Sequence, residues 1–339
     1  MHIALDAMGG DHGPEGLIAG ALLAAKEADL TVSLVGDEKL LHSHFKKAAP
    51  ESGVGSRIHI VHSSQVVEMS DNPVDAIRKK KDSSIMVAFD MVRRGDADAV
   101  VSAGNSGATL AAAVRRLGRL KGVARPGIAS IFPTVKKPVV LMDIGANVDC
   151  RPLHLFQFAI MASAYSRSHE VVKPRIGLLT IGEETGKGNS LVKETYAMLE
   201  QSSLNFIGNV EGRDVYKGDV DVIVCDGFVG NICLKISEGL VEAAMKMLRD
   251  EIVKSLAAKI GFFLAKPAFR AFKKRVDYSE YGGAPLLGVN GTGVVCHGKS
   301  DATAIKNGIL GAATMVQKKV NSEIVKTIAT ESVERQVEV

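Results

Sequence analysis

The sequence contains no tryptophan and only five tyrosines among its 339 residues. Proteins that bind single-stranded nucleic acid usually stack its bases on aromatic side chains, so no such stacking surface is expected. The formal net charge is +4, from 42 basic and 38 acidic residues, and this is too small to imply a nucleic acid on electrostatic grounds. We therefore expect no nucleic-acid partner.

Cysteine is also scarce, because the chain has only four and no two of them show the Cys-x-x-Cys spacing. Histidines and cysteines likewise form no cluster with the spacing of metal ligands, so we expect no metal site. Buried free cysteines are normally reduced in the cytosol. We therefore predict structural thiols at all four positions: Cys150, Cys225, Cys233 and Cys296.

Long apolar segments are missing as well. No uninterrupted apolar run approaches the ~18 residues that suggest a membrane span. The N-terminal residues Met1 to Asp6 begin a strand-like pattern at once and leave no room for the basic and apolar regions of a signal peptide. We expect a cytoplasmic protein that does not cross a membrane.

What the sequence does contain is a repeated pattern of a buried strand, a glycine-rich turn and a helix. The apolar run Val220–Cys225 leads into a turn with an acid, two glycines and an amide, and an amphipathic run follows from Ile232 to Leu248. This repetition is typical of α/β proteins with a parallel sheet. With 339 residues and an apolar fraction of 46%, the chain can form one large α/β unit or two lobes.

Four turns of this kind are rich in glycine and polar residues: Ser102–Thr109, Asp143–Asn147, Gly182–Asn189 and Asp226–Asn231. In an open α/β sheet the carboxyl ends of the strands share one edge, so we expect these turns to line one crevice. In the first of them, glycines let backbone N–H groups converge at a helix start, which favours an anion site. The alternative is a tight turn that only packs strand against helix. The binding candidates there are Gly104, Asn105, Ser106 and Gly107.

The turn Gly182–Asn189 carries a lysine between two glycines and looks at first like a Walker A loop. It departs from that pattern, because Ile181 and Gly188 occupy positions that require glycine and serine or threonine. A lysine held between glycines still reaches an oxyanion as a point charge. We therefore predict Lys187 as a catalytic residue. The neighbouring binding candidates are Gly186, Gly188 and Asn189.

Two further places are candidates. Near the N-terminus, Gly9 and Gly10 lie between Asp6 and Asp11. These four residues either border the crevice or form an ordinary helix start in which Asp11 is the cap. Near the other end of the chain, His297 follows a strand. It is either a contact for an anion or thioester, or a structural hydrogen-bonding residue.

The segment 252–276 has seven basic residues, no acidic residue and four of the eleven phenylalanines of the chain. We expect Gly261 and Pro267 to break or bend it into two short amphipathic pieces. Such a segment is typical of a helical protrusion that lies on a membrane surface, and the alternative is a packed hairpin or a dimer contact. The membrane-contact candidates are Phe262, Phe263, Phe269 and Phe272.

Several chemistries are disfavoured by missing motifs. No Gly-x-Gly-x-x-Gly follows a strand, so a nicotinamide dinucleotide is not expected. No Gly-x-Ser-x-Gly nucleophile turn is present either. The glycine-rich turns, the amide side chains, one lysine and Asp226 suit an oxyanion, phosphate first, and include no obvious covalent nucleophile. We expect no cofactor.

Six motifs, in their order along the chain, resemble those of one enzyme family. They are Asp6-Ala-Met-Gly-Gly-Asp11, Ser102-Ala-Gly-Asn-Ser-Gly107, Asp143-Ile-Gly-Ala-Asn147, Gly208-Asn-Val-Glu-Gly212, Asp226-Gly-Phe-Val-Gly-Asn231 and Tyr281-Gly-Gly-Ala-Pro-Leu-Leu-Gly288 through His297-Gly298. They closely resemble the bacterial phosphate acyltransferase family, the acyl-carrier-protein:phosphate transacylases of phospholipid synthesis. The resemblance covers about residues 1–320, and Ser106 stands where many relatives have threonine, which preserves the hydroxyl group.

This resemblance implies a three-layer α/β sandwich with a mostly parallel central sheet, similar to isopropylmalate dehydrogenases and phosphotransacetylases. It also implies conversion of fatty acyl-carrier protein and inorganic phosphate into acyl phosphate, which feeds glycerol-3-phosphate acylation. The protein would be a homodimer that associates peripherally with the membrane. Its partners would be acyl-carrier protein, phosphate and a membrane glycerol-3-phosphate acyltransferase.

For this reaction we expect a cradle for phosphate and oxyanion built from Asn105, Ser106, Gly107, Lys187, Asn189 and Asn231. Asp226 would orient a group or act as base, His297 would assist catalysis, and Asn147 and Gly230 would complete the binding site. Two rival hypotheses are a metal- and nicotinamide-dependent β-decarboxylating dehydrogenase of the same architecture and a non-catalytic anion-binding module.

We expect residues 1–320 to form a single domain, in one piece or as two intertwined lobes, and the protrusion at 252–276 to belong to it. The remaining segment, 321–339, has no turn signals. We predict that it is a dispensable C-terminal tail.

Overall fold

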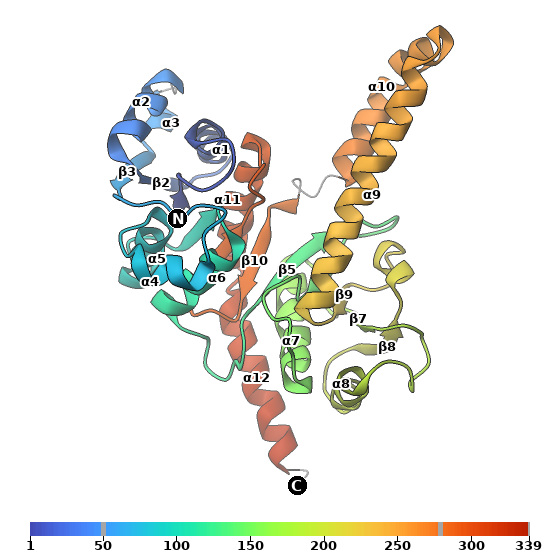
Figure 1. The fold of residues 1–339 in the computed structure, drawn as a ribbon. Coiled ribbons are helices and arrows are strands. Elements are labelled where there is room, and N and C mark those ends of the chain that lie inside the picture. Colours follow the sequence, from blue (N-terminus) through green and yellow to red (C-terminus); the bar gives the residue numbers. More distant parts are fainter. Residues whose placement is uncertain (49–51, 277–280, 338–339) are drawn as a thin grey trace.

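A computed structural model describes residues 1–48, 52–276 and 281–337 of the chain. Its strands form one twisted sheet with the order β3-β2-β1-β4-β11-β10-β5-β6-β9-β7-β8 (Figure 1). The first half of the sheet has the parallel strands β1 (His2–Asp6), β2 (Thr31–Gly36), β3 (Ile58–His62), β4 (Ala99–Ser102) and β11 (Thr292–Val295). The second half has the parallel strands β6 (Val139–Met142), β7 (Ile176–Leu179), β8 (Phe206–Val210) and β9 (Val222–Val224).

Two strands between the halves run antiparallel to their neighbours. β10 (Ala284–Leu287) pairs with β11 and with β5 (Gly127–Phe132), and β5 pairs with β6. Each of these pairings reverses the strand direction, so β6, β9 and β7 run opposite to β1, β4 and β11 along the hydrogen-bonded ladder. Central strands such as β6 and β9 are apolar and buried along their whole length, because helices cover both faces.

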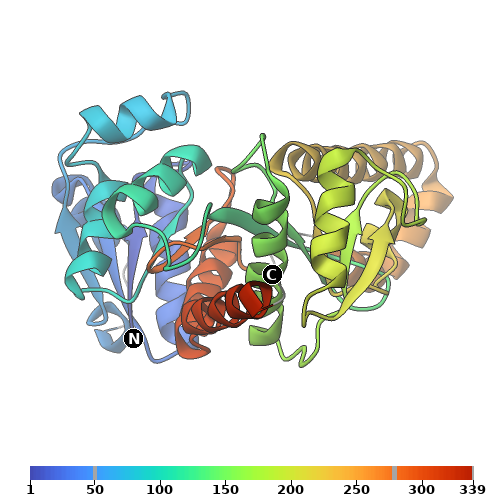
Figure 2. The same cartoon turned by 90° about the horizontal axis from the view of Figure 1, so that it is seen from below.

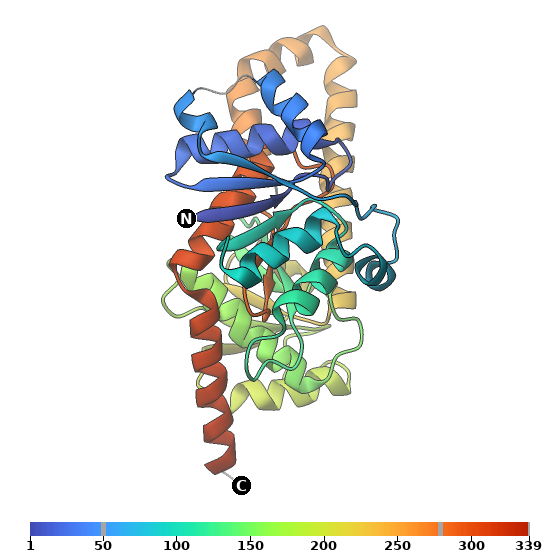
Figure 3. The same ribbon diagram turned by 90° about the vertical axis from the view of Figure 1, so that its left-hand side faces the viewer.

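Helices form a layer on each face of the sheet. One face is covered by α1 (Pro14–Glu27), α2 (Glu38–Ala48), α3 (Ser52–Gly55), α7 (Pro152–Ser168), α8 (Ser190–Glu200), α11 (Ala302–Gln317) and α12 (Val320–Val337). The other is covered by α4 (Pro73–Lys79), α5 (Ser84–Arg94), α6 (Ser106–Leu117), the 3-10 helix η1 (Gly212–Tyr216) and the first part of α9 (Gly227–Val253). In Figures 2 and 3, α4 and α9 lie on one side of the molecule and α12 on the other. The predicted three-layer α/β sandwich with a mostly parallel sheet is confirmed.

Two long helices form the protrusion. α9 continues beyond the sheet and α10 (Leu256–Val276) returns beside it, so the pair projects from the body as a hairpin (Figure 1). Of the expected break or bend, the break is wrong, because α10 is one helix that contains both Gly261 and Pro267. Figure 3 shows that this helix changes direction along its length, as the expected bend requires. Pro267 has no N–H to donate to the carbonyl of Phe263, which costs free energy. Packing against α9 stabilises the helix through this position, since tertiary contacts provide most helical stability.

The C-terminal segment forms a packed helix up to residue 337. α12 packs along α7, and Ile324 and Ile328 are buried in the core that α7 also enters. The buried Glu331 carboxylate accepts the Ser203 N–H at 3.2 Å. The sequence of 321–339 did not indicate this packing, because α12 is only weakly amphipathic; that the segment is dispensable stays a prediction. Residues 338–339 lie outside the described part of the chain.

The variant Ile328→Ala tests this packing. A methyl group of Ile328 lies 2.8 Å from the position that a Gly122 Cβ would occupy, so the side chain fills the space above that glycine. Truncation of a buried isoleucine to alanine typically costs about 2–5 kcal/mol. We expect the free energy of unfolding in urea to fall by that amount. The matched variant Lys326→Ala, at an exposed position of α12, should change it by less than about 0.5 kcal/mol; equal effects of the two would contradict the packing.

Candidate active site

The turns after β1 and β4 meet because these two strands are neighbours in the sheet. Asp6, the last residue of β1, is buried, and its carboxylate accepts a 2.7 Å hydrogen bond from the Ser102 hydroxyl at the end of β4. Burial raises the pKa of Asp6, because the charged form is desolvated. A Cβ at Gly9 would lie 2.7 Å from the backbone nitrogen of Gly104, so glycine is required for this approach. Asp6, Gly9 and Gly104 therefore hold the two turns together.

A third turn, after β11, joins this pair. The Asp11 N–H donates to the carbonyl of Gly298 at 2.8 Å, and a Cβ at Gly10 would lie 3.2 Å from the same oxygen. The alternative role of Asp11 as a helix cap is wrong, because no side chain caps α1. His297 lies beside this contact, and its Nδ1 accepts the Lys299 N–H at 3.1 Å. Gly10, Asp11 and His297 thus lie at the same end of the first half of the sheet.

The turn after β4 leads into α6, and Asn105 is the cap of that helix. Its Oδ1 accepts the Ala108 N–H at 3.0 Å. Its Nδ2 donates to the carbonyls of Met69 at 3.0 Å and Asp71 at 3.2 Å, which join the turn to the segment before α4. The amide group of Asn105 therefore positions the turn.

The first backbone N–H groups of α6 remain available to a ligand. Ser106 and Gly107 are exposed, and in the part of the chain that the structure describes no acceptor bonds to their N–H groups or to the Ser106 hydroxyl. A helix start with free N–H groups and a partial positive charge binds anions. A Cβ at Gly107 would lie 2.8 Å from the Pro73 ring, so a larger residue would push α4 away from this opening.

In the second half of the sheet the central residue is Asp143, directly after β6. Its buried carboxylate accepts the Ile128 N–H at 3.1 Å, and it accepts the N–H and the side-chain amide of Asn147 at 2.7 and 2.9 Å. Burial raises the pKa of Asp143 although these donors oppose the shift. Asn147 also donates to the carbonyl of Pro126 at 2.8 Å. Both amide hydrogens of Asn147 are thus engaged inside the protein, where they hold the turn.

The start of α9 packs directly on this turn. Asp226 caps the helix by accepting a backbone N–H of its first turn at 2.8 Å, and the Gly227 N–H donates to the carbonyl of Asn147 at 2.7 Å. A Cβ at Gly230 would lie only 1.9 Å from the carbonyl oxygen of Asp143. Glycine at this position is therefore a condition for the contact between α9 and the turn.

Asn231 and Lys187 are exposed side chains of this half. The Asn231 side chain lies over the turn after β6, with its Oδ1 3.8 Å from the position of a Gly145 Cβ. Lys187 belongs to the loop after β7, where its side chain folds across Gly182. Asn189 ends this loop as the cap of α8 and accepts a backbone N–H of the first helical turn at 3.0 Å.

The two glycines beside Lys187 differ in their role. Gly188 has a φ of +99°, and a Cβ there would lie 2.7 Å from the Thr180 hydroxyl, so this position requires glycine. A Cβ at Gly186 would have no atom within 4 Å. Only Gly188 shapes the loop that presents the lysine.

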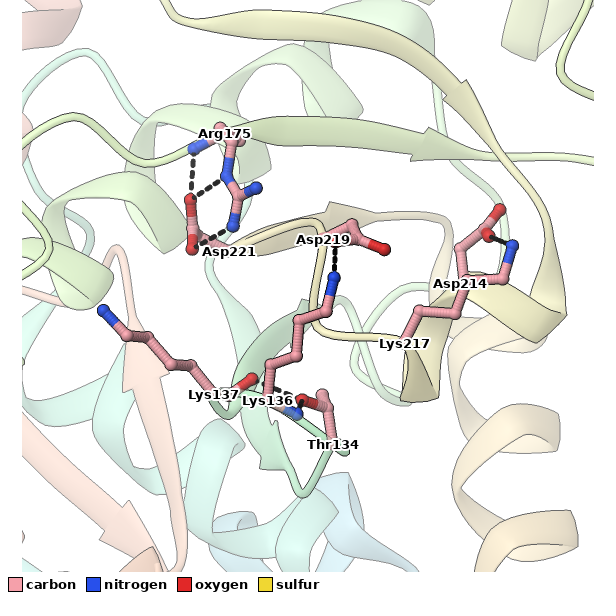
Figure 4. A network of polar contacts seen from close by, with 8 residues as sticks. All are labelled: Thr134, Lys136, Lys137, Arg175, Asp214, Lys217, Asp219 and Asp221. Carbon is pink, nitrogen blue, oxygen red and sulfur yellow. Dashed lines mark hydrogen bonds and ion pairs between the residues drawn. The ribbon is translucent and has the colours of Figure 1, made fainter.

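A polar network fixes β9, the strand that leads to Asp226 (Figure 4). Arg175 donates from two side-chain nitrogens to Asp221, just before β9, at 2.9 and 3.1 Å. Burial would raise the pKa of Asp221, but the hydrogen bonds from Arg175 outweigh it and the pKa is lowered. Lys136 pairs with Asp219, so the loop after β5 is joined to the start of β9.

The predicted site residues therefore fall into two groups. The group at the ends of β1, β4 and β11 contains Asp6, Gly9, Gly10, Asp11, Gly104, Asn105, Ser106, Gly107 and His297. The group at the ends of β6, β7 and β9 contains Asn147, Gly186, Lys187, Gly188, Asn189, Asp226, Gly230 and Asn231. All four turns were expected to leave the sheet at one edge. This expectation is wrong, because the antiparallel pairings of β10 and β5 reverse the strand direction between the two groups.

Sequence reasoning did not assign a role to Ser102 or Asp143. Both lie at the end of a buried apolar strand, and both bond across to a neighbouring segment. The available signal was a polar residue placed directly before a glycine-rich turn. Such a residue is buried with the strand, so it must find partners there.

Gly230 and Gly239 form a matched pair in α9. A Cβ at Gly230 would meet the Asp143 carbonyl oxygen at 1.9 Å, whereas one at Gly239 would have no atom within 4 Å. We expect Gly230→Ala to lower the free energy of unfolding by at least about 1–3 kcal/mol, because the start of α9 must move off the turn. Gly239→Ala should raise it by up to about 1 kcal/mol, since alanine favours the helix. Urea denaturation compares the two, and a Gly230→Ala protein as stable as Gly239→Ala would refute the contact.

Comparison with known proteins gives sequence matches over nearly the whole chain. The family model described as fatty acid synthesis protein matches residues 1–323. A protein of Geotalea uraniireducens named phosphate acyltransferase is 55% identical over 329 residues, which are 97% of this chain and 94% of that protein. Another of that name, from Geobacter sulfurreducens, is 53% identical over 332 residues, or 98% and 95% of the two chains.

Solved structures share the fold at much lower identity. A phosphotransacetylase from Streptococcus pyogenes aligns with a TM-score of 0.64 and 16% identity over 94% of each chain. A 4-hydroxythreonine-4-phosphate dehydrogenase from Klebsiella pneumoniae aligns with a TM-score of 0.52 and 14% identity, over 94% of this chain and 99% of the other. These two show the fold alone, and the sequence relatives support neither the dehydrogenase nor the non-catalytic hypothesis. The chain belongs to the phosphate acyltransferase family, and it is an enzyme of the transferase class.

Proposed function

We propose that this enzyme transfers a fatty acyl group from acyl-carrier protein to inorganic phosphate and releases acyl phosphate and free carrier protein. The proposal is supported by one observation. Some hydrogen-bond donors near the strand ends are not used by the bonds that hold the turns, so they are available to a ligand. These are the backbone N–H groups of Ser106 and Gly107, the ammonium group of Lys187 and the amide of Asn231. Together they suit an oxyanion. The product would feed glycerol-3-phosphate acylation in phospholipid synthesis.

Phosphate, rather than a side chain, is the nucleophile in this proposal. Burial, together with the carboxylates of Asp143 and Asp226, raises the pKa of Cys150 to about 11. Burial raises the pKa of Cys296 to about 12, and it also raises the pKa values of the other two thiols. A cysteine attacks as the thiolate, so none of these thiols is prepared for acyl transfer at neutral pH.

Sheet twist supports a shared site for the two groups of residues. Neighbouring strands rotate by roughly 20–25° relative to each other, and five steps separate β4 from β9 in the sheet order. The accumulated rotation of roughly 100–125° turns the reversed second half back towards the first. In Figures 2 and 3, α4 and α9 lie on the same side of the molecule, as parts of one helical layer. Phosphate would lie between the start of α6 and the loop of Lys187.

The chemistry needs positioning and charge stabilisation more than proton transfer. A phosphate oxygen attacks the thioester carbonyl carbon, and the carbon–sulfur bond then breaks. Negative charge develops on the carbonyl oxygen, where Lys187 and Asn231 would stabilise it. The leaving thiolate belongs to a thiol with a pKa of about 8.5 and takes up a proton from water, so no strong general acid is required. Asp226 would orient the start of α9, which carries Asn231.

We further propose that the enzyme is a cytoplasmic homodimer that contacts the membrane surface, where a glycerol-3-phosphate acyltransferase would consume acyl phosphate. Within the described ranges, no helix has the length and apolar composition needed to cross a bilayer. The hairpin supports a peripheral contact, because Phe263, Leu264 and Phe272 are exposed on the basic helix α10. Phe262 is less exposed, at 37%, and its ring packs on that of Phe269 with centroids 4.8 Å apart.

Lys187→Ala tests the role of the lysine. We expect the rate of acyl-phosphate formation to fall about 10²–10³-fold, the usual effect of removing one oxyanion donor. The assay is mass spectrometry of acyl phosphate formed from palmitoyl-carrier protein and phosphate. The control Lys193→Ala removes an exposed lysine from the nearby α8 and should keep wild-type turnover. Near-normal turnover of Lys187→Ala would remove this lysine from the site.

The membrane contact is tested by the double variant Phe263→Ser with Leu264→Ser. Phe263 is 71% exposed, and each large apolar side chain contributes about 1.5–3 kcal/mol when it leaves water. We expect cosedimentation with phosphatidylglycerol vesicles to weaken by at least about tenfold. Phe262→Ser is the comparison, since that ring packs on Phe269 and its loss should leave vesicle binding in place. If the double variant binds vesicles as well as the wild-type protein does, the outer side of α10 is a packing surface and not a membrane contact.

A further inference from the structure

Positive charge is concentrated in one part of the chain. Residues 71–125 carry eleven basic and six acidic side chains, a formal charge of +5, whereas the whole chain carries +4. The rest of the protein is therefore slightly acidic. The concentrated charge lies on α4, α5, α6 and the segments that follow them, in the helical layer over one face of the first half of the sheet.

The three helices are joined where their basic residues gather. Arg116 of α6 donates to the carbonyl of Lys81, just beyond α4, at 3.3 Å. It also pairs with Asp90 of α5 at 2.9 Å, and Arg93 of α5 pairs with the same carboxylate at 3.1 Å. One carboxylate is thus shared between two arginines, so the ion pairs leave an excess of positive charge at this junction.

Several basic side chains around the junction have no acidic partner. Within the described ranges, the side chains of Lys79, Lys81 and Arg115 form no ion pair or hydrogen bond, and all three are exposed. Arg78 pairs with Asp75 at 3.3 Å, but both side chains are more than half exposed, and such a pair contributes little. Like charges in one place repel each other, so acidic groups of a partner would relieve this repulsion. We call Arg78, Lys79, Lys81 and Arg115 the basic surface.

The helix α4 connects the basic surface with the candidate active site. Its first residue, Pro73, lies at the start of α6, since a Cβ at Gly107 would be 2.8 Å from the proline ring. A rise of 1.5 Å per residue places Lys79 about 9 Å further along the helix. In Figure 3, α4 projects from the body on the side that α9 also occupies. A macromolecule on the basic surface would therefore lie next to the free N–H groups of Ser106 and Gly107.

Two apolar side chains are exposed at the end of α4 that faces the site. Val74 is 70% exposed, and Met69 is 44% exposed, with its methyl group 3.0 Å from the position of a Gly298 Cβ. Protein interfaces usually combine apolar contacts with a polar, charged rim. The basic surface and these two side chains supply both kinds of contact.

We propose that the basic surface is the docking site of the acyl-carrier protein, a protein partner with an acidic surface. Carboxylates of the carrier contact the basic surface, and its flexible pantetheine arm brings the thioester along α4 to the start of α6. The inference rests on the proposed function and adds to it the place where the protein substrate binds. Because the contacts are ionic and exposed, salt weakens the complex.

The double variant Lys79→Glu with Lys81→Glu tests this docking site. It reverses two charges of the basic surface, so we expect the Kd for the holo form of the carrier protein, which has no acyl group, to rise at least about tenfold in isothermal titration. The matched control is Lys46→Glu with Lys47→Glu. It makes the same change of charge at exposed residues in the last turn of α2, which covers the opposite face of the sheet, and should keep the wild-type Kd. Equal effects of the two variants would overturn the proposal, because overall charge would then govern binding.

Turnover separates docking from chemistry. We expect the double variant to raise the KM for palmitoyl-carrier protein at least about tenfold and to keep kcat, the pattern that loss of uniform binding produces. With palmitoyl-pantetheine, a thioester without the carrier, KM and kcat should both match those of the wild type. Arg115→Glu, on α6, replaces the double variant if circular dichroism shows that the latter does not fold. Weaker cosedimentation with phosphatidylglycerol vesicles, with Kd and KM unchanged, would make the basic surface a membrane contact and overturn the proposal.

Failure of this inference differs from failure of the proposed function. If the wild-type enzyme forms no acyl phosphate from palmitoyl-carrier protein, the proposed function fails, and the Kd for the holo carrier still decides whether the basic surface is a docking site. If turnover occurs and the double variant binds the carrier as tightly as the wild type does, the proposed function stands and the carrier docks elsewhere. The expected result is turnover by the wild type together with a selective loss of carrier affinity in the double variant.

Discussion

The contact between the start of α9 and the turn after β6 determines the geometry of the second half of the site. Gly230 lies against the Asp143 carbonyl, where a Cβ would be 1.9 Å from the oxygen. The turn keeps its shape because the buried Asp143 carboxylate accepts donors from Ile128 and Asn147. Burial of a carboxylate costs several kcal/mol unless donors compensate for lost water. These bonds therefore hold the surface over which Asn231 lies.

Helix capping and anion binding use the same residue types in this protein. Asn105, Asn189 and Asp226 were predicted as site residues, and the structure shows each of them as an N-cap. A cap bonds one backbone N–H in the first turn and leaves the N–H groups before it free. At α6 the free groups belong to Ser106 and Gly107. A short polar side chain after a strand thus indicates a helix start from sequence alone, whereas the three-dimensional fold decides which donors face a ligand.

Local patterns predicted the elements better than their arrangement. The helices α2 (Glu38–Ala48) and α5 (Ser84–Arg94) are of the kind that a local pattern indicates, because their amphipathic periodicity lies within the segment itself. The reversal of strand direction at β10 depends on pairing between β10 and residues far away in sequence, so no local pattern indicates it. The same holds for α10, which continues through Pro267 beside α9, and for α12, whose partner α7 is buried along almost its whole length. The candidate turns were found because glycine and amide residues mark them locally, whereas their division into two groups follows from the sheet.

The helix α10 presents two different surfaces, and its sequence spacing explains how. Lys259, Phe262, Lys266 and Phe269 line a cavity of about 1260 Å³ between the hairpin and the end of β5, and these steps of three or four residues keep them on one side of a helix with 3.6 residues per turn. Phe263 follows Phe262 directly but is 71% exposed against 37% for Phe262, because one step along the helix turns the side chain by about 100°. One side of α10 thus lines the cavity while the other side faces solvent. Lys259 and Lys266 place positive charge along the cavity side, next to the rings of Phe262 and Phe269.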